Sequence, residues 1–316
     1  MFLVRLKKAN GQFKKDGVYI FDNENVKRVP PSYGEVYPFD DLPTFNGQPN
    51  LILLRSGGIG DLMAYSILHD VCPNIIFITQ AKYRPFMKLW ETKPKFNTPN
   101  DPVFFARDRY DMIKKMQLYG RLNGIEDAIE LGSTRNWYEI IEDASTIHNK
   151  RRRPCIVKPD APFIPGCLIV SKSSVTDRTA NHTDILEAVK PFYNNIVLSH
   201  EQQWTEQQYI EALAGFEMVI SVDTSAIHIR EGFKLPALGL YGAFVKECRT
   251  SGYEYTDSIQ INQCSPCQRH SRIPCKVNKG TSYAPCLSGQ VMINQIREYF
   301  ESKQDNEIHT NISAIN

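Results

Sequence analysis

The sequence has no apolar run that approaches the roughly 18 residues needed to span a bilayer. It also has no basic segment followed by an apolar stretch, the pattern of a secretory leader. The net charge over 316 residues is only +2, which argues against a bulk polyanion as partner. We therefore expect a cytoplasmic protein, peripheral to a membrane at most. The 42% hydrophobic and 23% charged content is typical of globular proteins, and the length suffices for two domains.

The eight cysteines do not form an obvious disulfide framework. Four are scattered and predicted to be reduced and packed: Cys72, Cys155, Cys167 and Cys248. The other four are clustered: Cys264, Cys267, Cys275 and Cys286. In a reducing compartment, a Cys-x2-Cys knuckle followed by two more cysteines indicates a tetrahedral metal site before disulfides. Four thiolates leave no open position, so the metal is expected to be structural. Free thiols are the alternative, and His270 is a substitute ligand.

The stretch Val219 to Phe244 predicts a strand, a tight turn, a short helix and a second strand. Asp223, Thr224 and Ser225 are three consecutive candidate N-caps, and Pro236 ends the helical segment. The free backbone N–H groups at such a turn face the crevice above the strand ends, where they hold anions such as a diphosphate. Capped helices occur in any αβ unit, so the turn alone does not decide. His228 favours an anion site, because it lies four residues past Thr224 on the same helical face.

The stretch Leu51 to Val71 predicts a buried strand, a glycine-rich turn and a helix. Gly57, Gly58 and Gly60 are not followed by the further glycine, three residues on, of a dinucleotide-binding fingerprint. A dinucleotide-binding turn is therefore a weak interpretation. Asp61 opens the helix and is either a helix cap or a functional carboxylate.

Two segments together resemble glycosyltransferase family 9, the ADP-heptose:lipopolysaccharide heptosyltransferases. The family signature D-T-G-L-x-H-x-A-A-A-x-x-x-P-x-x-x-L-[FY]-G is matched at Asp223, Thr224, His228, Pro236, Leu240, Tyr241 and Gly242. Ser225 replaces its glycine, and Arg230 and Glu231 stand where small residues are usual. The family's first strand ends in [IV]-[RK]-x-x-x-[IL]-G-D, matched at Arg55, Ile59, Gly60 and Asp61.

The resemblance implies an α/β protein of the GT-B fold, with two Rossmann-like domains facing across a cleft and a small N-terminal β-appendage. It implies an inverting glycosyltransferase in which Asp61 is the general base, with no metal needed for catalysis. The implied donor-binding residues are Ser171, Lys172, Arg178, Asp223, Thr224, Ser225, Ala226 and His228. Arg178 is the nearest substitute for a lysine that the family uses on the phosphates. Arg55, Gly58 and Gly60 are acceptor or phosphate candidates, although Arg55 is equally compatible with a strand-end surface residue.

The implied partners are a nucleotide diphosphate sugar similar to ADP-heptose and an acceptor glycan, protein or nucleobase. A homo-oligomer is a further expectation. The related autotransporter heptosyltransferases are described as binding iron through a similar four-cysteine finger, so iron or zinc is expected at the cysteine cluster. A non-catalytic nucleotide-binding or sugar-binding module is the alternative function. A nucleic-acid-binding knuckle is weaker, because no concentrated basic face accompanies it.

The expected organisation has four parts. Residues 1–49 form the β-appendage, with strands at Phe2–Leu6 and Val18–Phe21 and an extended connector from Val29. Residues 50–153 form the acceptor-side domain, and residues 154–303 form the nucleotide-sugar-binding domain with its cysteine knuckle. Residues 304–316 are expected to be a disordered tail after a helix over Val291–Phe300.

Overall fold

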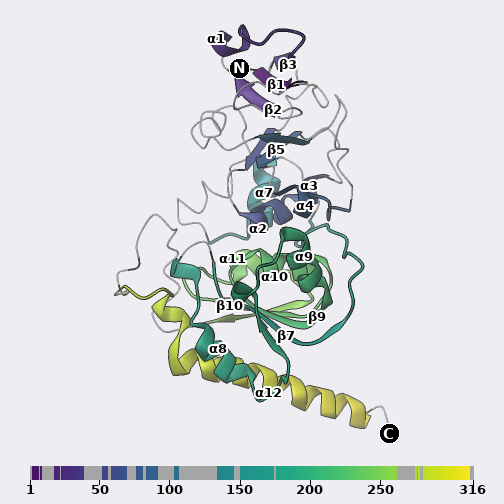
Figure 1. The fold of residues 1–316 in the computed structure, drawn as a ribbon. Helices are drawn as coiled ribbons and strands as arrows, with labels where there is room; N and C mark the ends of the chain where they lie inside the picture. Colours follow the sequence, from purple (N-terminus) through teal and green to yellow (C-terminus); the bar gives the residue numbers. More distant parts are fainter. Residues whose placement is uncertain are drawn as a thin grey trace. The chain divides into compact units, whose positions relative to one another are not determined.

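The computed structural model describes residues 2–6, 8, 18–21, 23–38, 52–55, 58–69, 76–80, 83–91, 103–106, 134–145, 150–173, 176–261, 275, 277 and 280–313. Its contacts divide the chain into two compact units, each a mixed α/β structure with its own sheet (Figure 1). The first unit comprises Met1–Asp127 and Tyr138–Arg151, and the second comprises Ala128–Trp137 and Arg152–Asn316. Among the described residues, no helix combines the length and the apolar character that a bilayer span requires.

The first unit contains a six-stranded sheet in the order β3-β1-β2-β6-β5-β4. The strands are β1 (Phe2–Leu6), β2 (Val18–Phe21), β3 (Gly34–Pro38), β4 (Ile52–Arg55), β5 (Ile76–Gln80) and β6 (Val103–Ala106). The last three pair in parallel, whereas β1 is antiparallel to β2 and β3. β2 joins the two parts through the pair Val18 and Ala106. The described helices are α1 (Asn23–Val26), α2 (Ile59–Ala64), α3 (Ser66–His69), α4 (Arg84–Met87) and α7 (Trp137–Ser145).

The structure confirms the two N-terminal strands and differs from the expected connector that follows them. β3 lies within that segment and pairs with β1 along its whole length. Prolines stand before this strand and at its last residue, Pro38, where the missing N–H does little harm to the ladder. The sequence pattern from Asp111 to about Ser145 predicts mostly helical structure. α7 agrees with its last part, and residues 111–133 lie outside the described residues.

The second unit contains a five-stranded parallel sheet in the order β11-β10-β9-β7-β8. Its strands are β7 (Ile164–Val170), β8 (Ile196–Leu198), β9 (Phe216–Val222), β10 (Ala237–Tyr241) and β11 (Thr256–Gln260). The three central strands are almost entirely buried, which explains why they appear in the sequence as short continuous apolar runs.

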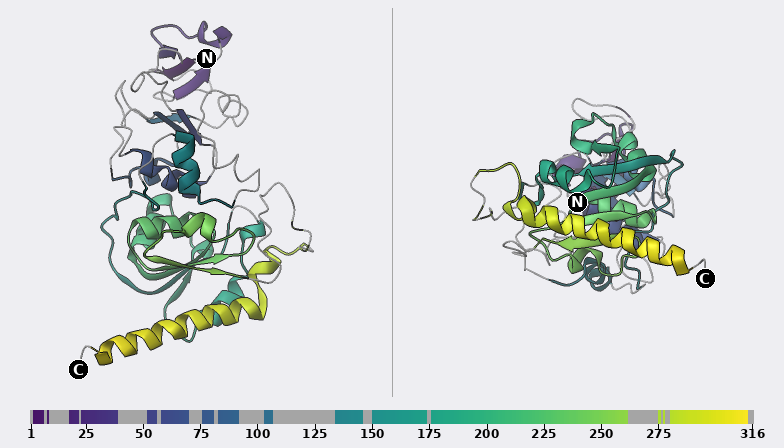
Figure 2. Two further views of the ribbon diagram at one scale, coloured as in Figure 1. Left: turned by 180° about the vertical axis from the view of Figure 1, so that it is seen from behind. Right: turned by 90° about the horizontal axis from the view of Figure 1, so that it is seen from below.

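Helices cover both faces of this second sheet (Figures 1 and 2). α8 (His182–Val189) and α12 (Gly289–Ser313) pack side by side on one face. Their Ile185 and Ile296 join Ile169 of β7 and Ile220 of β9 in one buried cluster. α9 (Glu206–Gly215) and α10 (Ser225–Gly232) lie on the other face. The result is a three-layer arrangement of helices, sheet and helices.

The structure also differs from the expected C-terminus. α12 continues to Ser313, so residues 304–313 are helical rather than a disordered tail. No glycine or proline interrupts the chain between Gln290 and Ser313, and Glu, Lys and Gln are good helix formers. Figure 1 shows α12 extending well past α8, and the residues of α12 beyond Phe300 are mostly polar.

Candidate functional site

The candidate site lies at the carboxyl edge of the second sheet. From β7 the chain passes to β8 on one side, and it later returns to β9 on the other side of β7. The crevice outside the carboxyl ends of two strands at such a reversal is the usual ligand site of open parallel sheets. Ser171 and Lys172 follow β7, and Asp223, Thr224 and Ser225 follow β9. Topology therefore brings these predicted donor-site residues to one edge.

Thr224 is the N-cap of α10. Its backbone is extended, and its Oγ1 accepts a hydrogen bond from the N–H of Ala226 at 3.3 Å. The hydroxyls of Ser221 and Thr224 are 2.8 Å apart, which fixes the cap. Ser225 is the first residue of the helix. The first turn of α10 thus begins at the carboxyl edge of the sheet, and its remaining N–H groups favour an anion there.

Asp223 brings two arginines to the same place. Its Oδ2 lies 3.7 Å from Arg178 Nη1 and 3.9 Å from Arg249 Nε. Asp223 and Arg249 are buried, with exposed fractions of 7% and 6%. Arg178 is half-buried in the short 3-10 helix η3 (Thr176–Arg178). The Arg249 guanidinium lies over the rings of Trp137 at 4.8 Å and Phe244 at 5.1 Å.

His228 is buried on α10, one turn past the cap. Its Nδ1 is 2.7 Å from the hydroxyl of Tyr253, and its ring centroid is 4.4 Å from that of Trp137. The structure therefore places this predicted phosphate ligand in an aromatic cluster beside the site. The same Trp137 contacts Arg249, so the histidine and the arginine share a supporting ring.

The carboxyl ends of β7 and β8 carry a second group of polar side chains. Ser171 is buried, and its Oγ is 3.5 Å from His200 Nδ1 at the end of β8, while Lys172 is exposed. The rings of His182 and His200 meet edge to face at 4.9 Å. Burial, followed by the charges of Lys172 and His182, lowers the pKa of His200 below 6.5. His200 is therefore biased toward the neutral imidazole near neutral pH.

Two buried ionic side chains hold α10 in place. Arg230 is fully buried and donates to the carbonyl oxygens of Leu213, Phe216, Glu217 and Pro236. These carbonyls include one from the last turn of α9, where helix acceptors lack internal partners. Burial lowers the pKa of Arg230 to about 10.

Glu231, also fully buried, accepts from the backbone N–H groups of Glu254, Tyr255 and Thr256 at 2.9–3.0 Å. Arg230 and Glu231, which stand where the family pattern has small residues, are thus both hydrogen-bonded to main-chain groups.

Gly232 is the last residue of α10, and the chain leaves the helix two residues later. Lys234, at φ 58°, adopts the left-handed conformation that ends the helix. A Cβ at Gly232 would lie 2.4 Å from Ile156 Cγ1, so this glycine permits close packing of the segment that leads into the unit.

Asp61 lies in the first unit, at the third residue of α2. The N-cap is Gly58, which has an extended backbone and makes no side-chain cap bond. The interpretation of Asp61 as the N-cap residue of this helix is therefore wrong. Gly60 is the second helical residue, and the Cβ position of Gly58 is 3.5 Å from Asp61 Oδ2. The half-buried carboxylate is thus turned back toward the glycine turn. Arg55 ends β4, and its side chain lies outside the described residues.

Only part of the predicted cysteine site is described, because Cys264 and Cys267 lie outside the described residues. Cys275 is half-buried, and Cys286 is buried in the 3-10 helix η5 (Pro285–Leu287). A Cβ at Gly242, which follows β10, would lie 2.6 Å from Cys286 Sγ. Within the described ranges no three His, Cys, Asp or Glu side chains gather closely enough to hold a metal ion. The four-cysteine site thus stays a prediction.

Sequence comparison with known proteins finds no matching family model and no matching curated protein. Comparison of structures does find matches. The bacterial iron-containing dodecameric glycosyltransferase TibC from enterotoxigenic E. coli H10407 aligns with a TM-score of 0.57 at 14% identity, over 87% of this chain and 80% of that chain. The chain has the fold of TibC.

A second TibC structure, the dodecameric iron-containing heptosyltransferase in complex with ADP-D-beta-D-heptose, aligns with a TM-score of 0.54 at 12% identity, over 87% of this chain and 82% of that chain. The E. coli heptosyltransferase WaaC with ADP aligns with a TM-score of 0.44 at 10% identity, over 79% of this chain and 98% of that chain, which is too distant to support an argument. The fold agrees with the resemblance to glycosyltransferase family 9. Arg249 and Trp137 are the site residues that sequence reasoning missed, because neither belongs to the family signature.

Proposed function

We propose that this chain is an inverting glycosyltransferase of GT-B architecture that transfers a sugar from a nucleotide diphosphate sugar to an acceptor hydroxyl. The observation that carries the proposal is the group of residues at the β7–β9 reversal. There the Thr224-capped start of α10 adjoins Arg178, Arg249 and Asp223. A helix N-terminus beside two guanidinium groups suits a diphosphate, which must be held before the reaction and stabilised as it leaves.

Asp61 is our candidate for the general base. Inverting transfer is an in-line displacement at the anomeric carbon, and it requires one carboxylate that takes the proton of the attacking hydroxyl. Asp61 lies beside Gly58, which carries no side chain, and the Cβ position of Gly58 is 3.5 Å from the carboxylate oxygen Oδ2. The diphosphate leaves as the acceptor oxygen forms its bond to the sugar, and the hydroxyl proton passes to Asp61. The proposal requires that the units of Asp61 and Thr224 close on one shared donor.

ADP-heptose is the first donor to test, because the TibC structure of this fold is a complex with ADP-D-beta-D-heptose. The acceptor class is open among a glycan, a protein side chain and a nucleobase hydroxyl. TibC is dodecameric, and we extend to this chain the expectation of a homo-oligomer. Light scattering coupled to size-exclusion chromatography measures the oligomer directly.

We further propose that Cys264, Cys267, Cys275 and Cys286 hold a structural iron or zinc. TibC is iron-containing, and thiolates suit both metals. Cys286 fits this role because η5 is held to the donor unit: the N–H of Ala284 donates to Thr179 O at 2.7 Å. The metal would cross-link the segment between Cys264 and Cys286. Metal analysis of the purified protein, repeated on Cys275→Ser, tests the assignment independently of activity.

The decisive experiment combines donor binding with turnover. A donor that binds the native state raises the melting temperature, so a panel of nucleotide diphosphate sugars identifies the ligand. Slow hydrolysis of the bound donor, or transfer to an acceptor, is then measured for the wild type, for Asp61→Asn and for the control Asp143→Asn. Asp143 is an exposed carboxylate of α7 in the same unit as Asp61.

We expect Asp61→Asn to keep the donor-induced melting shift and to lose about 10²- to 10⁴-fold in turnover. Asp143→Asn should match the wild type in both measurements. Donor binding without any turnover in the wild type would support the non-catalytic module instead. If no nucleotide diphosphate sugar shifts the melting temperature, the proposal fails.

A further inference from the structure

The ion pairs around Asp223 leave hydrogen-bonding groups unused. At 3.7 and 3.9 Å, its contacts with Arg178 and Arg249 are too long to be hydrogen bonds. Within the described part of the chain, Asp223 Oδ2 and Arg249 Nε are buried atoms without a hydrogen-bond partner. Buried polar groups are normally satisfied, and an unsatisfied charged group is costly. This group therefore has the character of a site whose remaining partner is a ligand.

Arg249 is held in one orientation by its surroundings. Its guanidinium lies over the rings of Trp137 and Phe244, each close enough for a cation–π contact. Asn136, which precedes Trp137, donates through Nδ2 to the carbonyl of Ser251 at 3.2 Å. The tryptophan is thus tied to the end of the helix that carries Arg249, namely α11 (Glu247–Thr250).

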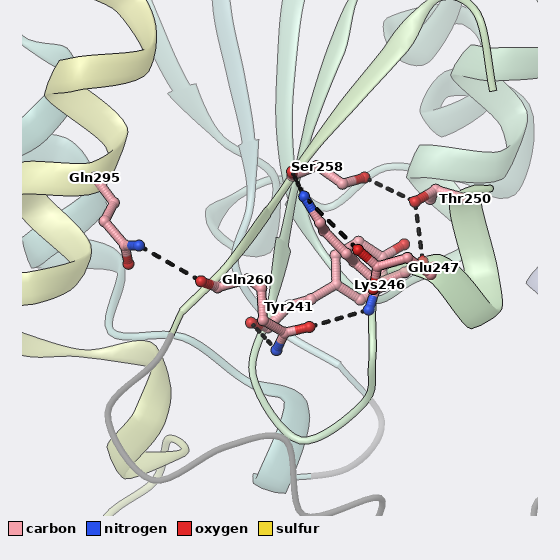
Figure 3. A network of polar contacts seen from close by, with 7 residues as sticks. All are labelled: Tyr241, Lys246, Glu247, Thr250, Ser258, Gln260 and Gln295. Atoms are coloured by element: carbon pink, nitrogen blue, oxygen red, sulfur yellow. Dashed lines mark hydrogen bonds and ion pairs between the residues drawn. The ribbon is translucent and has the colours of Figure 1, made fainter. Parts of the chain in front are cut away.

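A polar network fixes α11 to the edge of the sheet (Figure 3). The N–H of Lys246 donates to Gln260 Oε1 at 3.0 Å, and its Nζ donates to the carbonyl of Ser258 at 3.1 Å. The hydroxyl of Ser258 donates to Thr250 Oγ1 at 3.0 Å. Both ends of α11 are therefore bonded to β11, and the position of Arg249 is set before any ligand arrives.

The charges also point to a negatively charged ligand. One carboxylate, Asp223, is shared by Arg178 and Arg249, so the three side chains carry a net charge of +1. Exposed Lys172 at the end of β7 and the start of α10 add further positive potential at the same edge. A planar guanidinium binds two phosphate oxygens side by side, which a lysine ammonium does not.

We propose that Arg249, together with Arg178, binds the diphosphate of the donor. The two arginines would replace the phosphate-binding lysine of the family, which has no clear counterpart in this sequence. The inference rests on the proposed function, because it assigns a residue to the donor site described there. Asp223 keeps the two guanidinium groups in register at the start of α10. The bound diphosphate then supplies the hydrogen-bond acceptor that the Arg249 guanidinium lacks.

The test measures binding of ADP, inorganic pyrophosphate and adenosine to the full chain by calorimetry. The variants are Arg249→Met, Arg249→Lys and the control Arg297→Met. Arg297 is a half-exposed arginine of α12 that pairs with Glu187. Circular dichroism and melting curves verify the fold of each variant. Because Arg249→Met removes a buried charge, Arg249→Lys provides a second measurement that retains the charge and loses the planar fork.

We expect Arg249→Met to weaken ADP and pyrophosphate about 10- to 100-fold, the equivalent of losing charge-assisted hydrogen bonds. Arg249→Lys should be weaker than the wild type by a smaller factor, and adenosine should bind all variants alike. If the wild type binds ADP and folded Arg249 variants bind it equally well, the inference is overturned while the proposed function stands. If the wild type binds no diphosphate, including UDP, GDP and CDP, the proposed function itself fails.

Discussion

Glu231 provides a direct test of how α10 is held in position. Its Oε1 accepts from the N–H of Glu254, and its Oε2 accepts from the N–H groups of Tyr255 and Thr256, all within 3.0 Å. Glu231→Ala removes these acceptors and leaves three backbone donors at the start of β11 without them. An unsatisfied buried donor costs about 1–3 kcal/mol. Since water entering the cavity recovers part of this, we expect a loss of about 3–5 kcal/mol in the free energy of unfolding.

Glu231→Gln separates the shape of this side chain from its charge. The amide keeps one oxygen, and its NH2 group meets a backbone donor, so we expect an intermediate loss of about 1–3 kcal/mol. Burial raises the pKa of Glu231, although the three backbone donors and Arg153 oppose this effect. The stability contributed by the raised pKa is fully present below the unfolded value of 4.5 and is lost as the pH rises through the folded value. Glu231→Gln should remove this slope.

The assay is urea unfolding at pH 4.5, 5.5 and 7, with Glu211→Ala as the control. Glu211 is an exposed glutamate of α9, and its loss should change the free energy of unfolding by at most about 0.5 kcal/mol. If Glu231→Ala unfolds at the same urea concentration as Glu211→Ala, the three main-chain bonds contribute nothing and the reasoning is refuted.

Three further outcomes are expected. Gly232→Ala should lose about 1–3 kcal/mol through overpacking, because its Cβ would lie 2.4 Å from Ile156 Cγ1. In urea unfolding, the double variant with Ile156→Ala should lose less stability than the sum of the two single variants, because the second change removes the clash. NMR titration should give His200 a pKa below 6.5, and this pKa should rise in Lys172→Gln because the charge of Lys172 helps to lower it. The stability that the lowered pKa of His200 contributes should be fully present above pH 6.5 and should decrease at lower pH. If the pKa is the same in Lys172→Gln as in the wild type, the charge of Lys172 is not a cause of the shift. Gly242→Ala should displace Cys286, whose Sγ would lie 2.6 Å from the new Cβ, and lower both melting temperature and metal content; a wild-type metal content would argue against the Cys286 ligand.

The local signals of the second unit could be interpreted from the sequence because they depend on neighbouring residues. The spacing of Thr205 and Gln208 predicts a capping box, and the structure has one at the start of α9 with both reciprocal hydrogen bonds present. Thr224 is the N-cap among its three candidates, since its hydroxyl reaches the N–H of Ala226. The apolar runs of β9 and β10 are buried strands, as their composition predicts. Each of these features is decided within a few residues.

Other features depend on contacts that are distant in the sequence. Arg249 reaches Asp223 across 26 residues and Trp137 across more than a hundred, so no local pattern marks it as part of the site. Lys234 ends α10 in a conformation more usual for glycine, which hides the helix end in the sequence. The length of α12 was missed for a different reason: its last turns are polar, and periodicity detects only the part of a helix that packs.

The burial of Arg230 and Glu231 changes how the mismatch with the family signature is interpreted. Small residues at these positions would let α10 approach the sheet; here two long side chains reach past the helix instead and bind main-chain groups on either side. Arg230 holds the junction of α9 and β9, and Glu231 holds the start of β11. A helix fixed at this end presents its opposite end, at Thr224, to the crevice without rearrangement, which is what electrostatic stabilisation of a leaving diphosphate requires. Arg230 and Glu231 therefore hold α10 from both sides, and their departure from the signature gives no reason to favour a binding module over an enzyme.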